Sequence, residues 1–299
     1  MYDPSPRDDR FTYPTSVPAP RQVPPPSLPP GAHGPRHPLL LPVLLIAINA
    51  GVWLWTVLGG ANAFSPKPAD LEAWGGNSAL LTLHDQPWRL FTSMFLHAGA
   101  THLFFNMYFL FQIGPLLVRR KGPAGFAVVY LGGGLLASMA SAWWQLQSIL
   151  RTGAGQLPRL IVSVGASGAI MAVAGALACS LVLGHWRVQN DARGYAYSVA
   201  DRSLMQSLLQ VIAVNVAMGF FISGLDQAAH LGGLLAGALL GLILPGVADR
   251  LPAAKRWLRV AAAAGASGLL LAAAWLLIRH GQQFERAYEL LLRHVQQGR

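Results

Sequence analysis

The chain has 299 residues, of which 53% are hydrophobic and only 11% are charged, and its mean hydropathy is +0.41. Soluble domains contain about 25% charged residues, so this composition excludes an ordinary soluble domain and indicates a polytopic membrane protein. The formal charge of +10 suggests a nucleic-acid partner, but the Lys and Arg residues lie in short segments between apolar runs and form no single basic face. We therefore expect lipid headgroups, and no nucleic acid, to meet these charges.

Residues 1–38 are rich in proline and lack apolar periodicity, which predicts a disordered cytoplasmic tail. Three aspartates and the lack of an apolar core with a cleavage site argue against a secretory signal or an organelle presequence. The single cysteine, Cys179, lies within an apolar run and predicts a small core residue. With one cysteine there is no intrachain disulfide and no cysteine cluster, and we expect no metal and no cofactor.

Seven apolar runs approach the roughly 20 residues that cross a bilayer core as a helix. They are residues 39–59, 101–118, 124–145, 167–184, 204–223, 228–247 and 258–279. The fold class is therefore all-α, a polytopic membrane helical bundle. Residues 281–298 predict a short amphipathic helix after the last span.

The Lys and Arg residues between the runs predict the orientation, because cytoplasmic connections carry an excess of them. With a cytoplasmic N-terminus, the inside segments carry clusters such as the basic run 119–121, whereas the outside connections carry only Lys67, Arg89, Arg151 and Arg159. Seven spans then place the C-terminal tail outside, although its four arginines weaken this assignment.

The long first outside connection, residues 60–100, is rich in aromatic and apolar residues, including Trp74 and the pair Trp88-Arg89. Tryptophan is enriched at the membrane interface. We expect a structured insert that is partly immersed; the alternative is an ordinary aromatic anchor.

Polar residues open the second run, where His97 and His102 precede Asn106. His102 and Asn106 are four residues apart, so they share one helix face. Two hypotheses fit them equally. One is a polar clamp between helices, worth about 1 kcal/mol, and the other is an oxyanion hole.

The fourth run begins with Gly165-Ala166-Ser167-Gly168, which places the backbone N–H of Ser167 at a helix N-terminus, a good position for an oxyanion. The same tetrapeptide recurs at residues 265–268, where Ser267 lies deep in an alanine-rich span and predicts packing. Ser167 does not stand in a Gly-Xaa-Ser-Xaa-Gly elbow, because Ala169 occupies the second glycine position.

The sixth run opens with Asp226 and His230, followed by glycines every four residues at 233, 237 and 241. A glycine stripe allows close helix approach, and if the partner is the fourth run, His230 comes within hydrogen-bond reach of Ser167. A serine needs such a base to become a nucleophile, so the residues indicate a membrane-embedded serine hydrolase. Asp226 suits an N-cap better than a third catalytic member.

Together these motifs resemble the rhomboid intramembrane serine proteases over residues 40–247. The motifs are Trp88-Arg89, His97, His102, Asn106, Gly165 to Gly168, and His230 with Gly233 and Gly237. The resemblance implies a six-helix core with a Ser167–His230 dyad, oxyanion donors from His102, Asn106 and the Ser167 backbone, and cleavage of membrane proteins in or beside their spans. Met171 stands where the family often has an aromatic residue, and Val118 stands where it often has a glutamate bracing the second helix.

The predicted organisation is a tail at 1–38, a rhomboid-like catalytic core at 39–247, and a segment 248–299 with a cytoplasmic loop, a seventh helix and the amphipathic tail. We expect the partners to be single-span or polytopic membrane protein substrates and the lipid bilayer. We expect the protein to lie in the bacterial inner membrane. The alternatives are a noncatalytic rhomboid-like binder of transmembrane clients, which usually lacks the serine or the histidine, and a transporter using the histidines as a proton relay. Transporters commonly show internal repeats with broken helices, and none is evident here.

Overall fold

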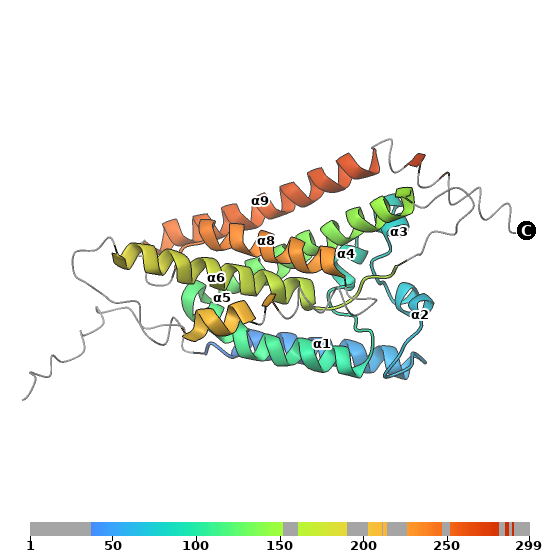
Figure 1. Cartoon of the computed structure of the whole chain (residues 1–299), viewed down its shortest axis with the longest axis horizontal. Coiled ribbons are helices and arrows are strands. Elements are labelled where there is room, and N and C mark those ends of the chain that lie inside the picture. The colour runs from blue at the N-terminus through green and yellow to red at the C-terminus, as the bar shows by residue number, and fades with distance from the viewer. Residues whose placement is uncertain are drawn as a thin grey trace, which may run out of the picture. The chain divides into compact units, whose positions relative to one another are not determined.

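The computed structural model describes residues 37–151, 161–189, 203–210, 212–213, 226–246, 252–280, 285–286 and 289. In this part of the chain, the regular elements are helices (Figure 1). Three predictions fall wholly or mostly outside it: the tail 1–38, the second half of the span 204–223 and the amphipathic helix 281–298. All the described residues belong to one compact unit, residues 34–299.

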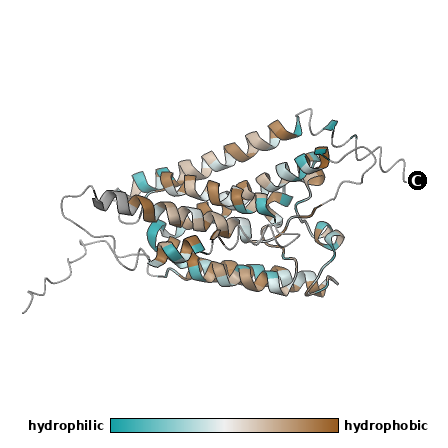
Figure 2. Ribbon diagram, viewed as in Figure 1, coloured by the Kyte–Doolittle hydropathy of each residue, from teal (hydrophilic) through white to brown (hydrophobic). Residues whose placement is uncertain are grey.

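The long apolar helices match the predicted spans. Three of them are long and apolar enough to cross a membrane: α1 (Leu40–Leu58), α5 (Ala100–Arg151) and α9 (Ala253–Arg279). Two shorter apolar helices are α6 (Ser167–Gln189) and α8 (Gln227–Ile243). Apolar residues run along these helices, whereas hydrophilic residues gather near their ends (Figure 2). The prediction of an all-helical membrane bundle is confirmed, and the count of seven spans stays a prediction.

Two predicted spans, 101–118 and 124–145, correspond to the two halves of α5, which are separate helices joined by a sharp turn. Gly122 interrupts the helix with φ 78° and ψ 169°, a conformation that a residue with a side chain rarely adopts. Pro123 follows it, and the chain reverses direction here (Figure 1). The two halves of α5 therefore lie on either side of a sharp turn.

The predicted glycine stripe packs against the fourth predicted span. A methyl group on Gly233 would lie 2.1 Å from the Gly168 carbonyl oxygen, and one on Gly237 would lie 1.9 Å from the Ala172 carbonyl oxygen. On the other side, a methyl group on Gly175 would lie 2.2 Å from the Leu234 carbonyl oxygen. The backbones of α6 and α8 thus touch along several turns, as the sequence predicted.

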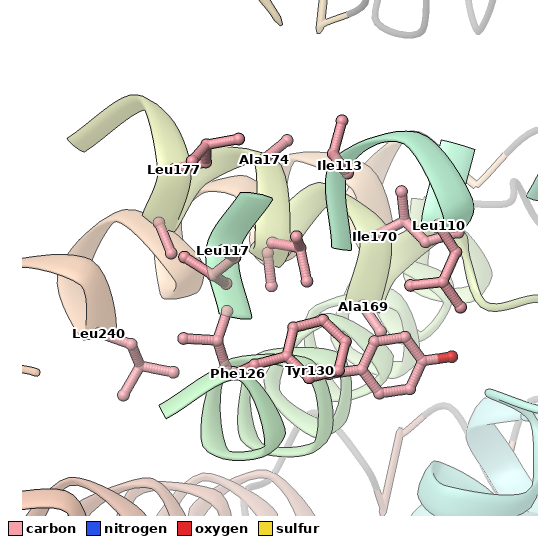
Figure 3. Close-up of a cluster of buried hydrophobic side chains, with 14 of the residues drawn as sticks. Leu110, Ile113, Leu117, Phe126, Tyr130, Ala169, Ile170, Ala174, Leu177 and Leu240 are labelled. Atoms are coloured by element: carbon pink, nitrogen blue, oxygen red, sulfur yellow. The ribbon is translucent and has the colours of Figure 1, made fainter. Parts of the chain in front are cut away.

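A buried hydrophobic cluster joins α6 and α8 to both halves of α5 (Figure 3). Leu117 comes from the first half, Phe126 and Tyr130 from the second, Leu177 from α6 and Leu240 from α8. Lipid tails are as apolar as these side chains, so close packing rather than removal from water drives this association.

The connection between α1 and α5 folds into an insert with three short helices, α2 (Pro68–Ala73), α3 (Ala79–His84) and α4 (Arg89–Thr92). Buried Arg89 holds the insert together: Nη1 donates to the carbonyl oxygens of Glu72 at 2.6 Å and Gly76 at 2.9 Å. Its guanidinium also lies 4.8 Å from the centre of a Trp88 ring. Burial lowers the pKa of Arg89, although Glu72 and Asp85 act against this. The predicted structured insert is confirmed, and its immersion stays a prediction.

The last helix, α9, packs against the second half of α5 and against α3. Ser267 is buried and bonds within its own helix, donating to the Ala263 carbonyl oxygen at 2.8 Å. Its Oγ lies 3.2 Å from where a methyl group on Gly132 would stand. Further along, Trp275 Nε1 donates to the Thr82 carbonyl oxygen at 3.1 Å. The prediction that Ser267 is a packing residue is confirmed.

A lysine that the sequence did not single out connects α5 to the far end of α8. Nζ of buried Lys121 donates to the carbonyl oxygens of Gly241 and Leu244, each at 2.7 Å. These carbonyls end a helix, where the backbone has no further donors. Lys121 thus joins α5 to α8. It lies three residues after Val118, the position at which the rhomboid family often has a glutamate that braces the second helix.

Candidate active site

Ser167 is the first residue of α6 and is partly exposed. Just before it, Gly165 has φ +128° and its N–H donates to the Ser93 carbonyl oxygen at 2.9 Å. The first turn of the helix closes with Ile170 N–H donating to the Ala166 carbonyl oxygen at 2.9 Å. The N–H of Ser167 is therefore one of the free donors that begin a helix.

His102 and Asn106 face the segment that leads into Ser167. A methyl group on Gly165 would lie 2.7 Å from His102 Cε1, 3.1 Å from His102 Nε2 and 3.6 Å from Asn106 Nδ2. Gly165 therefore has two reasons to be glycine: its positive φ and the approach of these two side chains. His102 and Asn106 thus lie on one helix face, as predicted, and this face contacts the segment that contains Gly165.

The hydrogen bonds of His102 indicate its tautomer. Ala98 N–H donates to His102 Nδ1 at 3.3 Å, so Nδ1 accepts and a neutral ring carries its proton on Nε2. Nε2 is the nitrogen that faces Gly165. The site therefore offers an N–H donor from His102 beside Gly165, two residues before Ser167.

His97 lies behind His102, with a ring-to-ring distance of 5.3 Å. Burial lowers the pKa of His97 to about 3, the nearby His102 lowers it further, and its hydrogen bond with the Phe95 carbonyl oxygen acts in the opposite direction. A ring with that pKa is neutral at pH 7, so His97 places no positive charge beside His102.

Asn106 keeps an unused donor. Its Nδ2 is buried and has no hydrogen-bond partner among the residues that the structure describes. Most buried polar atoms in native proteins are paired. A paired amide would indicate a clamp between helices, whereas an unpaired one facing Gly165 suits a donor to a bound oxygen atom.

His230 is buried in the first turn of α8. Its neighbours touch those of Ser167: a methyl group on Gly168 would lie 3.7 Å from Ala229 Cβ, and Gly233 packs on the Gly168 carbonyl. The N-terminal ends of α6 and α8, with one candidate residue each, thus meet at the close crossing of the two helices.

Asp226 caps α8. Its Oδ1 accepts a hydrogen bond from Ala229 N–H at 2.9 Å, which confirms the N-cap hypothesis. Nδ1 of His230, which an orienting carboxylate would contact, is buried without a hydrogen-bond partner in the described part of the chain. Asp226 is therefore not bonded to His230 as a third catalytic member would be.

The remaining predicted residues lie around this crossing. Trp88 and Arg89 belong to the insert, and Gly233 and Gly237 form the helix contact. Sequence reasoning did not single out Ser141 and Ser163, whose hydroxyls bond to Asp226. Ser141 and Gln145 share one face of an apolar helix, which was an available signal, whereas Ser163 carries none.

The apolar helices and the polar side chains at their crossing define an integral membrane protein of the helical-bundle class. Residues 84–246, more than half of the chain, match the family described as the Rhomboid domain. The chain belongs to the rhomboid family. The amino-acid sequence is 31% identical over 229 residues to the rhomboid protease AarA of Providencia stuartii, covering 75% of this chain and 79% of that protein.

Two further relatives are longer. RHOMBOID-like protein 2 of Arabidopsis thaliana is 35% identical over 182 residues, which are 60% of this chain and 50% of that protein. The rhomboid protease GluP of Bacillus subtilis (strain 168) is 30% identical over 185 residues, which are 60% of this chain and 31% of that protein. The similarity to these longer proteins therefore concerns only part of them.

Proposed function

We propose that this protein is an intramembrane serine endopeptidase that cleaves membrane proteins in or near their transmembrane segments. Ser167 is the nucleophile and His230 the general base. The observation that carries the proposal is the close crossing of α6 and α8, at which the neighbours of Ser167 and His230 touch. Relatives named as rhomboid proteases support the reaction class.

The proposed reaction begins when His230 takes the hydroxyl proton of Ser167 and the oxygen attacks a peptide carbonyl. The resulting oxyanion accepts hydrogen bonds from the Ser167 N–H, His102 Nε2 and Asn106 Nδ2. Donors fixed before the reaction need no rearrangement as the charge develops. His230 then gives its proton to the leaving amine, and water releases the acyl group by the reverse sequence.

The membrane setting limits which peptides react. A transmembrane helix bonds its carbonyls internally, so we expect cleavage where Gly, Pro or other helix-weakening residues free a carbonyl. Because hydrolysis consumes water, we propose that the site opens to the side opposite the cytoplasmic N-terminus, in the inner membrane of a bacterium. Reporter fusions at residues 38 and 299 would test this orientation and the odd number of spans.

The proposal is tested by incubating the purified protein in detergent with a single-span model substrate. Wild type should produce two fragments whose masses place one cut near the end of the span, and Ser167→Ala should produce none. A wild-type protein that binds the substrate without cutting it would instead be a noncatalytic binder of transmembrane clients. Cleavage that persists in Ser167→Ala would contradict the proposed nucleophile.

A further inference from the structure

Asp226 makes more contacts than a helix cap requires. Oδ1 accepts from Ala229 N–H, which completes the cap. Oδ2 accepts from two hydroxyl groups, those of Ser141 in α5 and Ser163 in the segment before α6. Capping one helix needs one oxygen, so the second oxygen connects α8 to two other parts of the chain.

Ser163 and Asp226 stand at the same distance in sequence from the two proposed catalytic residues. Ser163 precedes Ser167 by four residues, and Asp226 precedes His230 by four residues. The bond between Ser163 and Asp226 therefore joins the segment that begins α6 to the residue that begins α8. Bonds between a hydroxyl and a carboxylate are stronger than those between neutral groups.

The insert holds the other side of the same segment. Ser163 and Asn77 exchange two backbone hydrogen bonds, each of 2.9 Å, in an isolated antiparallel bridge. Asn77 is fully buried, and its side chain donates to the Ser138 carbonyl oxygen at 2.8 Å. The segment before Ser167 is thus fixed between the insert and Asp226.

Ser141 extends the connection into the second half of α5. Gln145 Nε2 donates to Ser141 Oγ at 3.0 Å, and Gln145 Oε1 accepts from Ala79 N–H at 3.0 Å. A network in which the members satisfy one another holds its parts more firmly than separate bonds do. Asp226 is the carboxylate in this network, and it bonds directly to α8, to α5 and to the segment before α6.

We propose that Asp226 is a positioning residue for the Ser167–His230 pair: through Oδ2 it holds Ser163 and Ser141, and so fixes the start of α6 against the start of α8. It acts through Ser163 and contacts no substrate. The proposal rests on the proposed function for its catalytic consequence, whereas its structural core, the connection between residues 163 and 226, stands independently of any activity.

The test separates the cap from the connection. Asp226→Ser keeps an N-cap oxygen but loses Oδ2, and Ser163→Ala keeps the whole cap but loses the connection. Ser180→Ala is the matched control, because that hydroxyl donates within α6, to the Ala176 carbonyl oxygen at 2.7 Å, and not to Asp226. Amide hydrogen exchange of the full chain in detergent follows residues 161–168 and 226–233 in each variant.

We expect Asp226→Ser and Ser163→Ala each to accelerate exchange in residues 161–168 by about tenfold, the effect of losing one bond to a charged group. The double variant should exchange no faster than Asp226→Ser alone, because Asp226→Ser already removes the Ser163 bond. Ser180→Ala should match wild type. Unchanged exchange at 161–168 in both single variants would overturn the proposal.

Cleavage measured on the same preparations distinguishes this inference from the proposed function. Loss of the connection in Asp226→Ser should lower kcat more than it changes KM. Asp226→Asn keeps an oxygen for the cap and a polar group for both hydroxyls, so its kcat should be higher than that of Asp226→Ser. A proportionate loss of folded protein, with normal kcat per folded molecule, would show that Asp226 serves stability alone. If wild type cleaves nothing, the proposed function fails, and hydrogen exchange still decides whether Asp226 fixes the segment.

Discussion

The chain contains the same tetrapeptide twice, and its two copies lie in different surroundings. Gly165 has a positive φ and adjoins His102, whereas Gly265 lies inside α9 with open space around it. Gly168 packs against α8, whereas a methyl group on Gly268 would meet nothing within 4 Å. The same four residues therefore form a helix entry in one place and the middle of a helix in the other, where the two glycines are exposed and Ser267 packs near Gly132.

The difference comes from what precedes each copy and what faces it. Residues 161–166 are not helical, so Ser167 begins a helix and keeps a free N–H. Ser267 follows fourteen helical residues of α9, Ala253 to Ala266, and its hydroxyl bonds back to Ala263. A serine within a helix commonly bonds in this way. We therefore propose that the chemical role of Ser167 depends on its position at a helix terminus and on His230. The following predictions test each part.

Removing the proposed base, His230, should have the largest effect. His230→Ala leaves Ser167 without a proton acceptor, and we expect turnover to fall by about a million-fold, to below detection, as in other enzymes that lose one member of such a pair. His280→Ala at the end of α9 is the control and should cleave normally. Initial rates on the single-span substrate measure both, and substantial activity in His230→Ala would exclude it as the base.

The next largest effect should follow removal of the proposed oxyanion donor, Asn106. Asn106→Ala should lower kcat by about a hundredfold, the usual cost of one lost donor, with little change in KM. Gln112→Ala on the same helix removes an exposed amide that donates to the Tyr108 hydroxyl, and it should have no effect. Full turnover with an earlier unfolding transition in Asn106→Ala would show that this amide is an interhelical clamp.

The first glycine of each tetrapeptide, Gly165 or Gly265, can be replaced by alanine, and the two replacements should change the stability of the fold in opposite directions. Gly165→Ala places a side chain at positive φ against His102 and should destabilise the fold by about 1 to 3 kcal/mol. Gly265→Ala lies in a helix with space around it and should stabilise it by about 0.5 to 1 kcal/mol. Thermal unfolding in detergent would show one midpoint lowered and the other slightly raised, and a fall at both would contradict the proposed difference in backbone conformation.

The smallest expected effect on turnover lies at the far end of the helix that carries His230. Lys121→Met leaves the carbonyls of Gly241 and Leu244 without their donor and should cost about 1 to 3 kcal/mol. Lys255→Met, near the start of α9 and exposed, is the control. We expect an earlier unfolding transition for Lys121→Met with kcat per folded molecule unchanged. A fall in kcat at full stability would place Lys121 in the catalytic apparatus.

The sequence was sufficient wherever a local pattern determines the structure. Apolar runs predicted α1 and α6 within a few residues, because length and hydropathy decide a span. The four-residue glycine repeat predicted the close crossing of α6 and α8, since only small residues allow such contact. Asp226 was predicted as a cap from its position at the N-terminus of the helix.

The contacts that the sequence did not predict depend on where separate segments meet. Lys121 bonds to two main-chain oxygens, and backbone acceptors leave no trace in a sequence. Ser163 faces Asp226 only because the insert pairs with it through Asn77. The break between the two halves of α5 at Gly122 agrees with the two separate spans that the sequence predicted, because Gly122 and Pro123 both interrupt a helix.

A fluorophosphonate that reacts with activated serines tests the central claim directly, because both tetrapeptides are present in one molecule. Trypsin cleaves after Arg159, Arg187, Arg259 and Arg279, so the two serines fall in different peptides, 160–187 and 260–279. We predict a single adduct on the first peptide, assigned to Ser167 by fragmentation and absent in His230→Ala. An adduct on Ser267, or equal labelling of wild type and His230→Ala, would contradict the account.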